Sequence, residues 1–365
     1  MVITKTHIYK YPIPMLPFTI ATGTMDYAQN IFIRIYTDAG IIGVGECSAF
    51  PMIVGETQAT CYEMAKDFAA IWKGKNPLEI EARMNELHSF TAGNYTAKSA
   101  FDLALYDIAA KHANKPLYQF LGGQKKDIVS DLTIGIGTPE YMAEQAAAFK
   151  TKNVTIIKVK LGKQPKADVE RIRQIRNAIG NTIKLRIDAN QGWNYEDALA
   201  ALTALAKYDI EFCEQPMRKH NDHLLPELSK LSPIAIMADE SVFDHYDAER
   251  IIRNNAAKYI NIKFSKSGGI LEATKINAVA EQHNMPCMMG GMLESRVALT
   301  AKVHFAMASN NIKFYDLDTC LLGHKIDPVI GGVTYNNMHL QLNDAIGIGA
   351  DVDEAYLKNL EQVVI

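Results

Sequence analysis

The sequence predicts an α/β fold: a closed (β/α)7β barrel preceded by a smaller α+β capping domain. From about residue 127 onward, short β-branched runs alternate with helical patterns, which is typical of an α/β domain. The acidic residues that end three of these runs are 26 residues (188 to 214) and 25 residues (214 to 239) apart. That step is the length of one strand plus one crossover helix. No Gly-x-Gly-x-x-Gly motif follows a predicted strand, so a dinucleotide-binding fold has no support.

Residues 1–125 are predicted to form the α+β capping (lid) domain. We expect an alternating strand over 2–11, a loop over 15–30, and a hairpin that joins 31–36 to 41–46 around Asp38-Ala39-Gly40. Helical patterns follow at 56–73, 78–90 and 95–113, and Leu121-Gly122-Gly123 is a helix stop signal.

Residues 126–327 are predicted to form the TIM-like barrel that carries the active site. The expected strands are 132–136, 155–160, 183–188, 211–214, 234–238, 259–263, 286–289 and 313–316. The expected helices are 139–151, 166–179, 195–208, 222–231, 245–255, 269–284 and 295–309. Eight strands with seven helices favour a closed barrel over an open sheet. The tail, 328–365, is Gly-rich and then helical in pattern, and we expect it to return to the capping domain.

Composition excludes several classes of partner. A net charge of -3 and a pI near 6.4 give no reason to expect nucleic acid or an anionic membrane. No apolar run approaches the roughly 18 residues of a spanning helix, and the N-terminus lacks a signal core. The five cysteines have no paired spacing, so they are expected to be reduced thiols of a cytoplasmic protein. We expect a homo-oligomer with a small-molecule substrate.

Three acids end three successive predicted strands: Asp188, Glu214 and Asp239. The carboxyl ends of barrel strands meet at one face, so these carboxylates should converge, and they repel each other unless a cation lies among them. All-oxygen ligands completed by water or substrate suit Mg²⁺. We therefore predict one Mg²⁺ per active site.

Two lysines flank the predicted metal site. Lys160 ends the second strand and Lys263 the sixth, so they face each other across an eight-stranded ring. Lys158 shares a strand face with Lys160, roughly 7 Å away at about 3.3 Å per residue. The positive charges of Lys158 and of the metal should lower the pKa of Lys160 and so favour the neutral amine that a base needs. Lysines on opposite flanks can remove a proton from one face of a carbon and return it to the other.

The motif Lys158-x-Lys160, followed by Asp188, Glu214, Asp239 and Lys263 at strand ends, resembles the enolase superfamily in its muconate-lactonizing subgroup. The resemblance covers essentially the whole chain. It implies removal of a proton next to a carboxylate, with Mg²⁺ stabilising the enediolate. Asp316-Leu317-Asp318 resembles the Asp-x-Asp motif with which dipeptide epimerases, such as L-Ala-D/L-Glu epimerases, hold the substrate's α-ammonium group. The expected reaction is therefore inversion of the C-terminal residue of an Ala-Xaa dipeptide.

Specificity is predicted from the capping domain. Ala-Glu epimerases carry an arginine in the lid loop, whereas that place here is Gly23-Thr24 and residues 21–29 contain no base. The other expected pocket residues are mostly apolar, which predicts a hydrophobic Xaa; Asp26 would instead favour a basic one. The predicted substrate-binding residues are Asp316, Asp318, Thr133, Met292, Leu293, Gly23, Thr24, Met25 and Ile53, with Phe50 and Met52 nearby. Asn190, Arg186 and Lys266 are expected to support them.

Other interpretations share parts of this pattern. The metal ligands and lysines also suit o-succinylbenzoate synthases, N-acylamino-acid racemases and cycloisomerases of the same subgroup, and a non-catalytic barrel is a further alternative. Asp188 alone could cap a helix, and Lys266 rivals Lys263 as the second base. Asp316 and Asp318 could form a turn or pair with a structural lysine.

Overall fold

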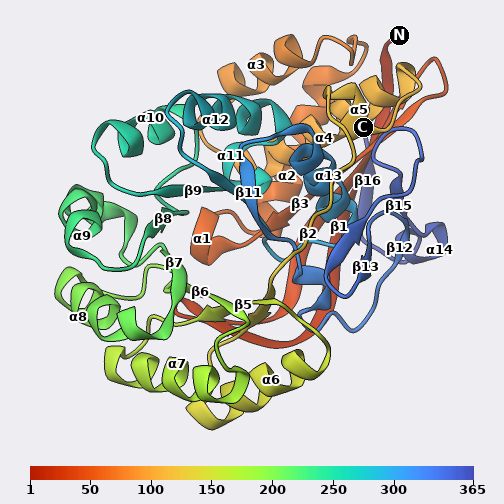
Figure 1. Ribbon diagram of the computed structural model, residues 1–365. Helices are drawn as coiled ribbons and strands as arrows, with labels where there is room; N and C mark the ends of the chain where they lie inside the picture. Colours follow the sequence, from red (N-terminus) through yellow and green to blue (C-terminus); the bar gives the residue numbers. More distant parts are fainter.

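The capping domain is built on an antiparallel sheet in the order β16-β1-β2-β3. Its strands are β1 (Ile3–Ile20), β2 (Gly23–Thr37), β3 (Ile42–Ala49) and, from the other end of the chain, β16 (Gln362–Val364). Its helices are α1 (Pro51–Val54), α2 (Gln58–Trp72), α3 (Ile80–Phe90), α4 (Tyr95–His112) and α5 (Leu117–Phe120). The computed structural model describes residues 1–365, and both termini lie on this sheet (Figure 1).

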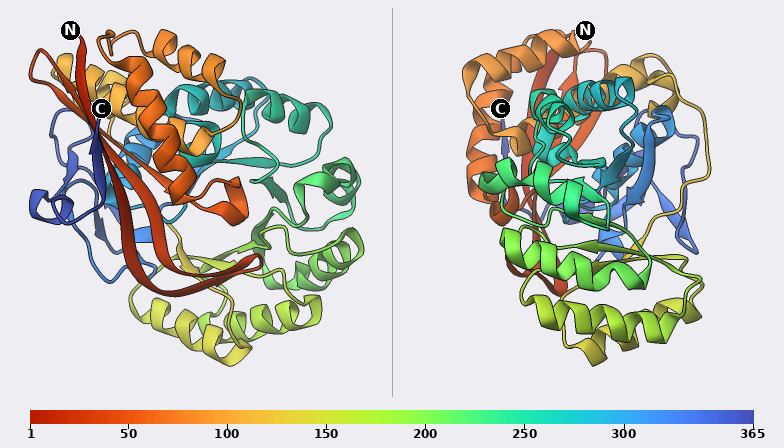
Figure 2. Two further views of the ribbon diagram at one scale, coloured as in Figure 1. Left: turned by 180° about the vertical axis from the view of Figure 1, so that it is seen from behind. Right: turned by 60° about the vertical axis from the view of Figure 1, so that its left-hand side comes forward.

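The loop expected over 15–30 is wrong, because β1 and β2 continue through it as one long hairpin. Prolines and low periodicity indicated a loop, but the hairpin accommodates Pro14 beside a register shift between Pro14 and Phe18. There the backbone finds partners outside the sheet, since Leu16 N donates to Gly323 O over 2.8 Å. Figure 2 shows the red hairpin extending from the capping domain across the barrel.

Eight parallel strands form the barrel in chain order, which confirms the predicted fold class. They are β4 (Leu132–Ile134), β5 (Ile156–Lys160), β6 (Lys184–Asp188), β7 (Ile210–Glu214), β8 (Ile236–Ala238), β9 (Tyr259–Ile262), β10 (Cys287–Gly290) and β11 (Ile312–Asp316). The first and last strands share no ladder, but Asp131 N donates to Tyr315 O over 3.1 Å and Leu317 N to Ser130 Oγ over 2.9 Å. These bonds bring the barrel close to closure.

Helices cover the outside of the barrel (Figure 1). They are α6 (Pro139–Thr151), α7 (Pro165–Ile179), α8 (Tyr195–Leu205), α9 (Leu225–Leu231), α10 (His245–Arg253), the short α11 (Phe264–Ser267), α12 (Ile270–Gln282) and α13 (Arg296–Ala308). Helix α7 begins with Pro165 in its first turn, and Gly180 ends it at a φ of 75°. No α-helix comes between β11 and the small strands of the tail.

The regular structure of the tail consists mainly of short strands, which corrects the expected helix. It contains β12 (Val329–Gly331), β13 (Thr334–Asn336), β14 (His339–Gln341), β15 (Ala350–Val352) and only a four-residue helix, α14 (Glu354–Leu357). Arg34 of β2 contacts Asp351 at 3.0 Å and donates to Val352 O over 2.8 Å, so the tail is tied to the capping sheet. No helix is long and apolar enough to cross a membrane.

An apolar floor closes the barrel interior. Phe212, Met237 and Met288 are buried together, and Tyr259 and Phe314 pack against them. Because this layer fills one end of the barrel, the inward-facing polar residues of the same strands gather at the carboxyl ends.

Candidate active site

Lys158 lies at the centre of the polar layer. Its side chain is fully buried, and its Nζ is 2.7 Å from Glu214 Oε2, 2.7 Å from Asp316 Oδ2 and 3.3 Å from Asp188 Oδ2. Burial opposes the charge, but the carboxylates, Asp316 first, outweigh it and raise the pKa of Lys158. Because its side chain is fully buried and three carboxylates surround its Nζ, Lys158 contributes a fixed positive charge at the centre of the site.

Lys160 and Lys263 come from opposite sides of the barrel. Lys160 ends the second barrel strand, β5, and Lys263 directly follows the sixth, β9. Lys160 Nζ is 2.6 Å from Asp188 Oδ2, and Lys263 Nζ is 2.8 Å from Asp239 Oδ2. Both lysines line one small cavity. Burial opposes the charge of Lys263, but Asp239 and then Glu214 raise the pKa of its ammonium group.

Asp188, Glu214 and Asp239 are completely buried at the ends of β6, β7 and β8. Burial, and then repulsion from Asp188, raise the pKa of Glu214 to about 7. Only lysine ammonium groups face three oxygens of these acids: Lys158 Nζ is 2.7 Å from Glu214 Oε2, and Lys263 Nζ and Lys266 Nζ are 2.8 Å and 2.5 Å from the two oxygens of Asp239. Three buried carboxylates that converge and face only cationic partners provide the all-oxygen ligands that a hard divalent cation such as Mg²⁺ prefers.

A second acidic group lies beside them. Asp131, Asp316 and Asp318 bring side-chain oxygens within 4.8 Å of one another. Asp188, Glu214 and Asp239 make no such compact group, and the amines of Lys158 and Lys263 contact their oxygens. Asp131 was not predicted, although it stands two residues before Thr133 and alternation along the strand indicates that the two share a face.

Asp318 is the acid of this second group that forms no ion pair, whereas Asp131 pairs with Arg186 and Asp316 with Lys158. Its Oδ2 accepts a hydrogen bond from Thr133 N over 2.7 Å, and its Oδ1 has no partner. Burial, and then repulsion from Asp316, raise the pKa of Asp318 to about 7. Burial also acts to raise the pKa of Asp316, but the positive charges of Lys158 and Lys160 outweigh burial and lower this pKa. A cation beside Asp318 would satisfy the unpartnered oxygen.

The three predicted supporting residues lie in different places. Asn190 lines the cavity, and its backbone N donates to Asp188 Oδ1 over 2.8 Å. Lys266 does not line the cavity, but its Nζ is 2.5 Å from Asp239 Oδ1 and donates to Val242 O over 3.0 Å. Arg186 is one layer deeper, 2.9 Å from Asp131 Oδ2 and over the rings of Phe212 and Phe314.

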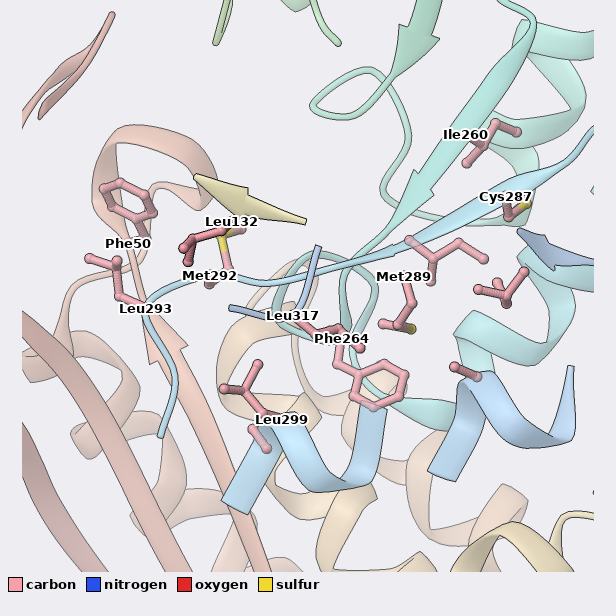
Figure 3. Close-up of a cluster of buried hydrophobic side chains, with 14 of the residues drawn as sticks. Phe50, Leu132, Ile260, Phe264, Cys287, Met289, Met292, Leu293, Leu299 and Leu317 are labelled. Carbon is pink, nitrogen blue, oxygen red and sulfur yellow. The ribbon is translucent and has the colours of Figure 1, made fainter. Parts of the chain in front are cut away.

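Apolar side chains close the other wall of the cavity. Four residues that were predicted to bind the substrate line the cavity: Ile53, Met292, Leu293 and Thr133. Phe18, Ile20 and Phe50 line it as well. Figure 3 shows Phe50 near Met292 and Leu293, which follow β10. Gly23, Thr24 and Met25 do not line it: Gly23 packs against Met52, Thr24 Oγ1 bonds Thr19 Oγ1 over 2.8 Å, and Met25 is buried in the core. The hairpin instead directs Phe18 and Ile20 of β1 toward the cavity.

The capping domain holds Leu293 by its backbone. Leu293 N donates to Ser48 Oγ over 3.3 Å, and Asn30 Nδ2 donates to Leu293 O over 3.0 Å. Buried Glu46 accepts from Ser295 N over 2.8 Å and Ala298 N over 3.0 Å at the start of α13. These positioning residues were missed because their partners are about 250 residues away, with no local motif to indicate them.

Two family models match the chain. One, described as mandelate racemase / muconate lactonizing enzyme, N-terminal domain, matches residues 3–122, and the other, enolase C-terminal domain-like, matches residues 141–356. The chain belongs to the mandelate racemase / muconate lactonizing enzyme family. This membership confirms the predicted enolase-superfamily relationship.

Characterised family members resemble the whole chain. A D-Ala-D/L-Ala epimerase from Cytophaga hutchinsonii is 43% identical over 100% of both chains. The structure of a dipeptide epimerase from the same organism, complexed with Mg and D-Ala-L-Val, has a TM-score of 0.98 at 43% identity, covering 100% of both chains. A hydrophobic dipeptide epimerase from Enterococcus faecalis is 39% identical over 91% of this chain and 94% of its own. An N-succinyl-L-Arg/Lys racemase from Bacillus cereus is 34% identical over 99% of this chain and 98% of its own. These relatives confirm the predicted isomerase class and Mg²⁺ cofactor.

Proposed function

We propose that this member of the family is a Mg²⁺-dependent dipeptide epimerase. It inverts the α-carbon of the C-terminal residue of a dipeptide of the Ala-Xaa type with an apolar Xaa. One observation carries the proposal: Lys160, Lys263, Asp316 and Asp318 line the same cavity, so two facing amines and an ammonium-binding acid pair meet one small substrate.

Asp188, Glu214 and Asp239 are the proposed Mg²⁺ ligands. When bound, the ion accepts charge from the substrate carboxylate and so lowers the barrier to loss of the neighbouring proton. Once the ion offsets part of the negative charge of these three acids, the lysine amines that contact them experience a weaker negative field. The charge of Lys158, which cannot reach solvent, stays beside the reacting centre.

Lys160 and Lys263 exchange the proton. One lysine removes the α-proton of the C-terminal residue and the other donates a proton to the opposite face, which inverts the configuration. Their positions on the second strand and after the sixth give each lysine one face of the carbon. The side chain of the inverted residue then lies toward Met292, Leu293 and Ile53.

Asp318 and Asp316 select a free amino terminus. The unpartnered Asp318 Oδ1 and the neighbouring Asp131 make an anionic site that suits an ammonium group. N-succinyl amino acids, o-succinylbenzoate precursors and muconates carry no cation at this place. The acid pair therefore disfavours N-acylamino-acid racemisation, although a relative with such a name is 34% identical.

Incubation in D₂O tests the proposal. The Mg²⁺-loaded enzyme should exchange the α-proton of the second residue of L-Ala-L-Xaa dipeptides and form the L-D product, detected by mass spectrometry and chiral chromatography. N-succinyl amino acids and N-acetylated dipeptides are the matched controls and should react at least about 100-fold more slowly. Turnover of the N-acylated compounds alone would replace this proposal with the racemase alternative.

We also propose that the protein is a cytoplasmic homo-oligomer. The location is proposed because the five cysteines form no disulfide, and free thiols are the usual state in a reducing compartment. Light scattering at micromolar concentration measures the oligomeric state, and the mass of a monomer would contradict the proposed homo-oligomer.

A further inference from the structure

A large groove opens on the outer side of β4. It has a volume of about 640 Å³ and lies between β4, α6, the β1 segment Leu16–Thr19 and the segment that follows β11. In a complete α/β barrel an eighth helix packs between the last and first strands. Here β11 is followed by short 3₁₀ and strand segments instead. The groove occupies the side of the first strand that the missing helix leaves open.

This groove adjoins the catalytic cavity. Phe18, Thr133 and Leu322 line both spaces. Thr133 N is also the donor that holds Asp318 Oδ2 at 2.7 Å. The proposed ammonium site therefore lies at the junction between the small cavity and the large groove.

The groove has the chemistry of an apolar side-chain pocket. Leu132 and Ile134 of β4 and the half-buried Phe149 of α6 form part of its wall. At its rim Leu16, Tyr141 and Leu321 are 59%, 53% and 45% exposed, which is unusual for large hydrophobic residues with no structural partner. An apolar ligand would cover this surface.

We propose that the groove binds the side chain of the first residue of the dipeptide, so that the substrates include dipeptides that begin with a large apolar residue. This inference rests on the proposed epimerase function. The ammonium group and the first side chain are attached to the same carbon, by bonds of about 1.5 Å each. Anchoring the ammonium at Asp318 therefore places the side chain at the mouth of the groove. The inverted residue occupies the opposite wall, near Met292 and Leu293.

The substrate range of the Mg²⁺-loaded wild-type enzyme tests this inference. L-Ala-L-Ala, L-Leu-L-Ala and L-Phe-L-Ala are compared by α-proton exchange in D₂O. The expected kcat/KM for the Leu and Phe dipeptides equals or exceeds that for Ala-Ala, mainly through a lower KM, because the apolar side chain leaves water. Values more than about 10-fold below that of Ala-Ala would overturn the inference while leaving the epimerase function intact. Exchange with none of the dipeptides tested would instead reject the proposed function itself.

A pair of tryptophan variants on α6 separates the groove from other causes. Gln145 is half-buried and lines the groove, whereas its neighbour Glu144 is exposed and does not. Gln145→Trp should lower the ratio of kcat/KM for Phe-Ala over Ala-Ala by about 10-fold or more, because the indole fills the pocket. Glu144→Trp should keep the wild-type ratio. An unchanged ratio in Gln145→Trp would overturn the inference. If this variant also dissociated an oligomer, the groove would be a contact between copies of the chain.

Discussion

Asp316 and Asp318 lie two residues apart but have different partners. Asp316 Oδ2 is 2.7 Å from Lys158 Nζ, so its charge is already balanced inside the protein. Asp318 has only the backbone donor of Thr133 and one oxygen without a partner. Of the two, Asp318 is the acid whose charge is available to a substrate ammonium group.

Asp318→Asn should therefore weaken substrate binding with little effect on folding. The amide oxygen can still accept from Thr133 N, but the charge that attracts the ammonium is lost. We expect KM for an Ala-Xaa dipeptide to rise roughly 30-fold or more, the lower range for removing one partner of a buried charge pair. Steady-state kinetics measure it, with the N-acetylated dipeptide as control, whose KM should change less. Equal changes for both substrates would contradict an ammonium-binding role.

At the scale of single elements, buried acids connect helices to the site. Asp102 of α4 accepts hydrogen bonds from Ile270 N and Leu271 N and so caps α12, which follows the Lys263 segment. Burial raises the pKa of Asp102 to about 8. The cap lies outside the proposed metal site.

The Asp102 cap should make folding stability depend on pH. The folded state holds a proton on Asp102 up to about pH 8, whereas the unfolded chain releases it near its ordinary value of 3.8. Between these values the folded state binds more protons, so the free energy of unfolding falls as pH rises, by up to about 1.4 kcal/mol per pH unit from this group. Urea unfolding at pH 5 and pH 8 measures it. The fall should be smaller in Asp102→Asn, and parallel profiles would contradict the argument.

The elements that the sequence predicted best are those with a local signal. Most barrel strands are short and rich in apolar residues, and the predicted helix over 139–151 agrees with α6 because Thr138 caps it and Pro139 opens it. The site residues at strand ends followed from the same periodicity. Thr133, Ile53, Met292 and Leu293 line the cavity as expected.

The elements that the sequence did not predict depend on distant partners. The hairpin over 15–30 is stabilised through Gly323, and β16 pairs with β1 across nearly the whole chain. The groove beside β4 was not predicted, although the (β/α)7β pattern correctly indicated that no helix follows the last barrel strand. Such features require the folded chain, since tertiary contacts override local preference.

For the whole molecule, metal binding and folding should be linked. A Mg²⁺ ion held at the assembled strand ends, as proposed, has no such site in the unfolded chain, so it should raise the free energy of unfolding by about 2.7 kcal/mol at 100 times its Kd. Asp239→Asn should remove most of this response in thermal or urea unfolding, whereas Asp318→Asn should retain it. The reverse pattern would place the ion in the Asp131, Asp316 and Asp318 group instead.

The capping domain completes the cavity, while the barrel supplies the proposed proton-transfer groups. Phe18, Ile20 and Phe50 cover the cavity, and β5 and the end of β9 supply the two lysines. The central claim is that these lysines serve opposite faces of one carbon.

Proton exchange in single lysine variants tests that claim most directly. Lys160→Ala and Lys263→Ala are incubated separately in D₂O with each epimer of one dipeptide, and α-deuterium is measured by mass spectrometry after circular dichroism shows a retained fold. The account predicts that neither variant inverts its substrate and that each exchanges the α-proton of one epimer only, a different epimer for each variant. Exchange of the same epimer by both variants, or inversion by either, would contradict it.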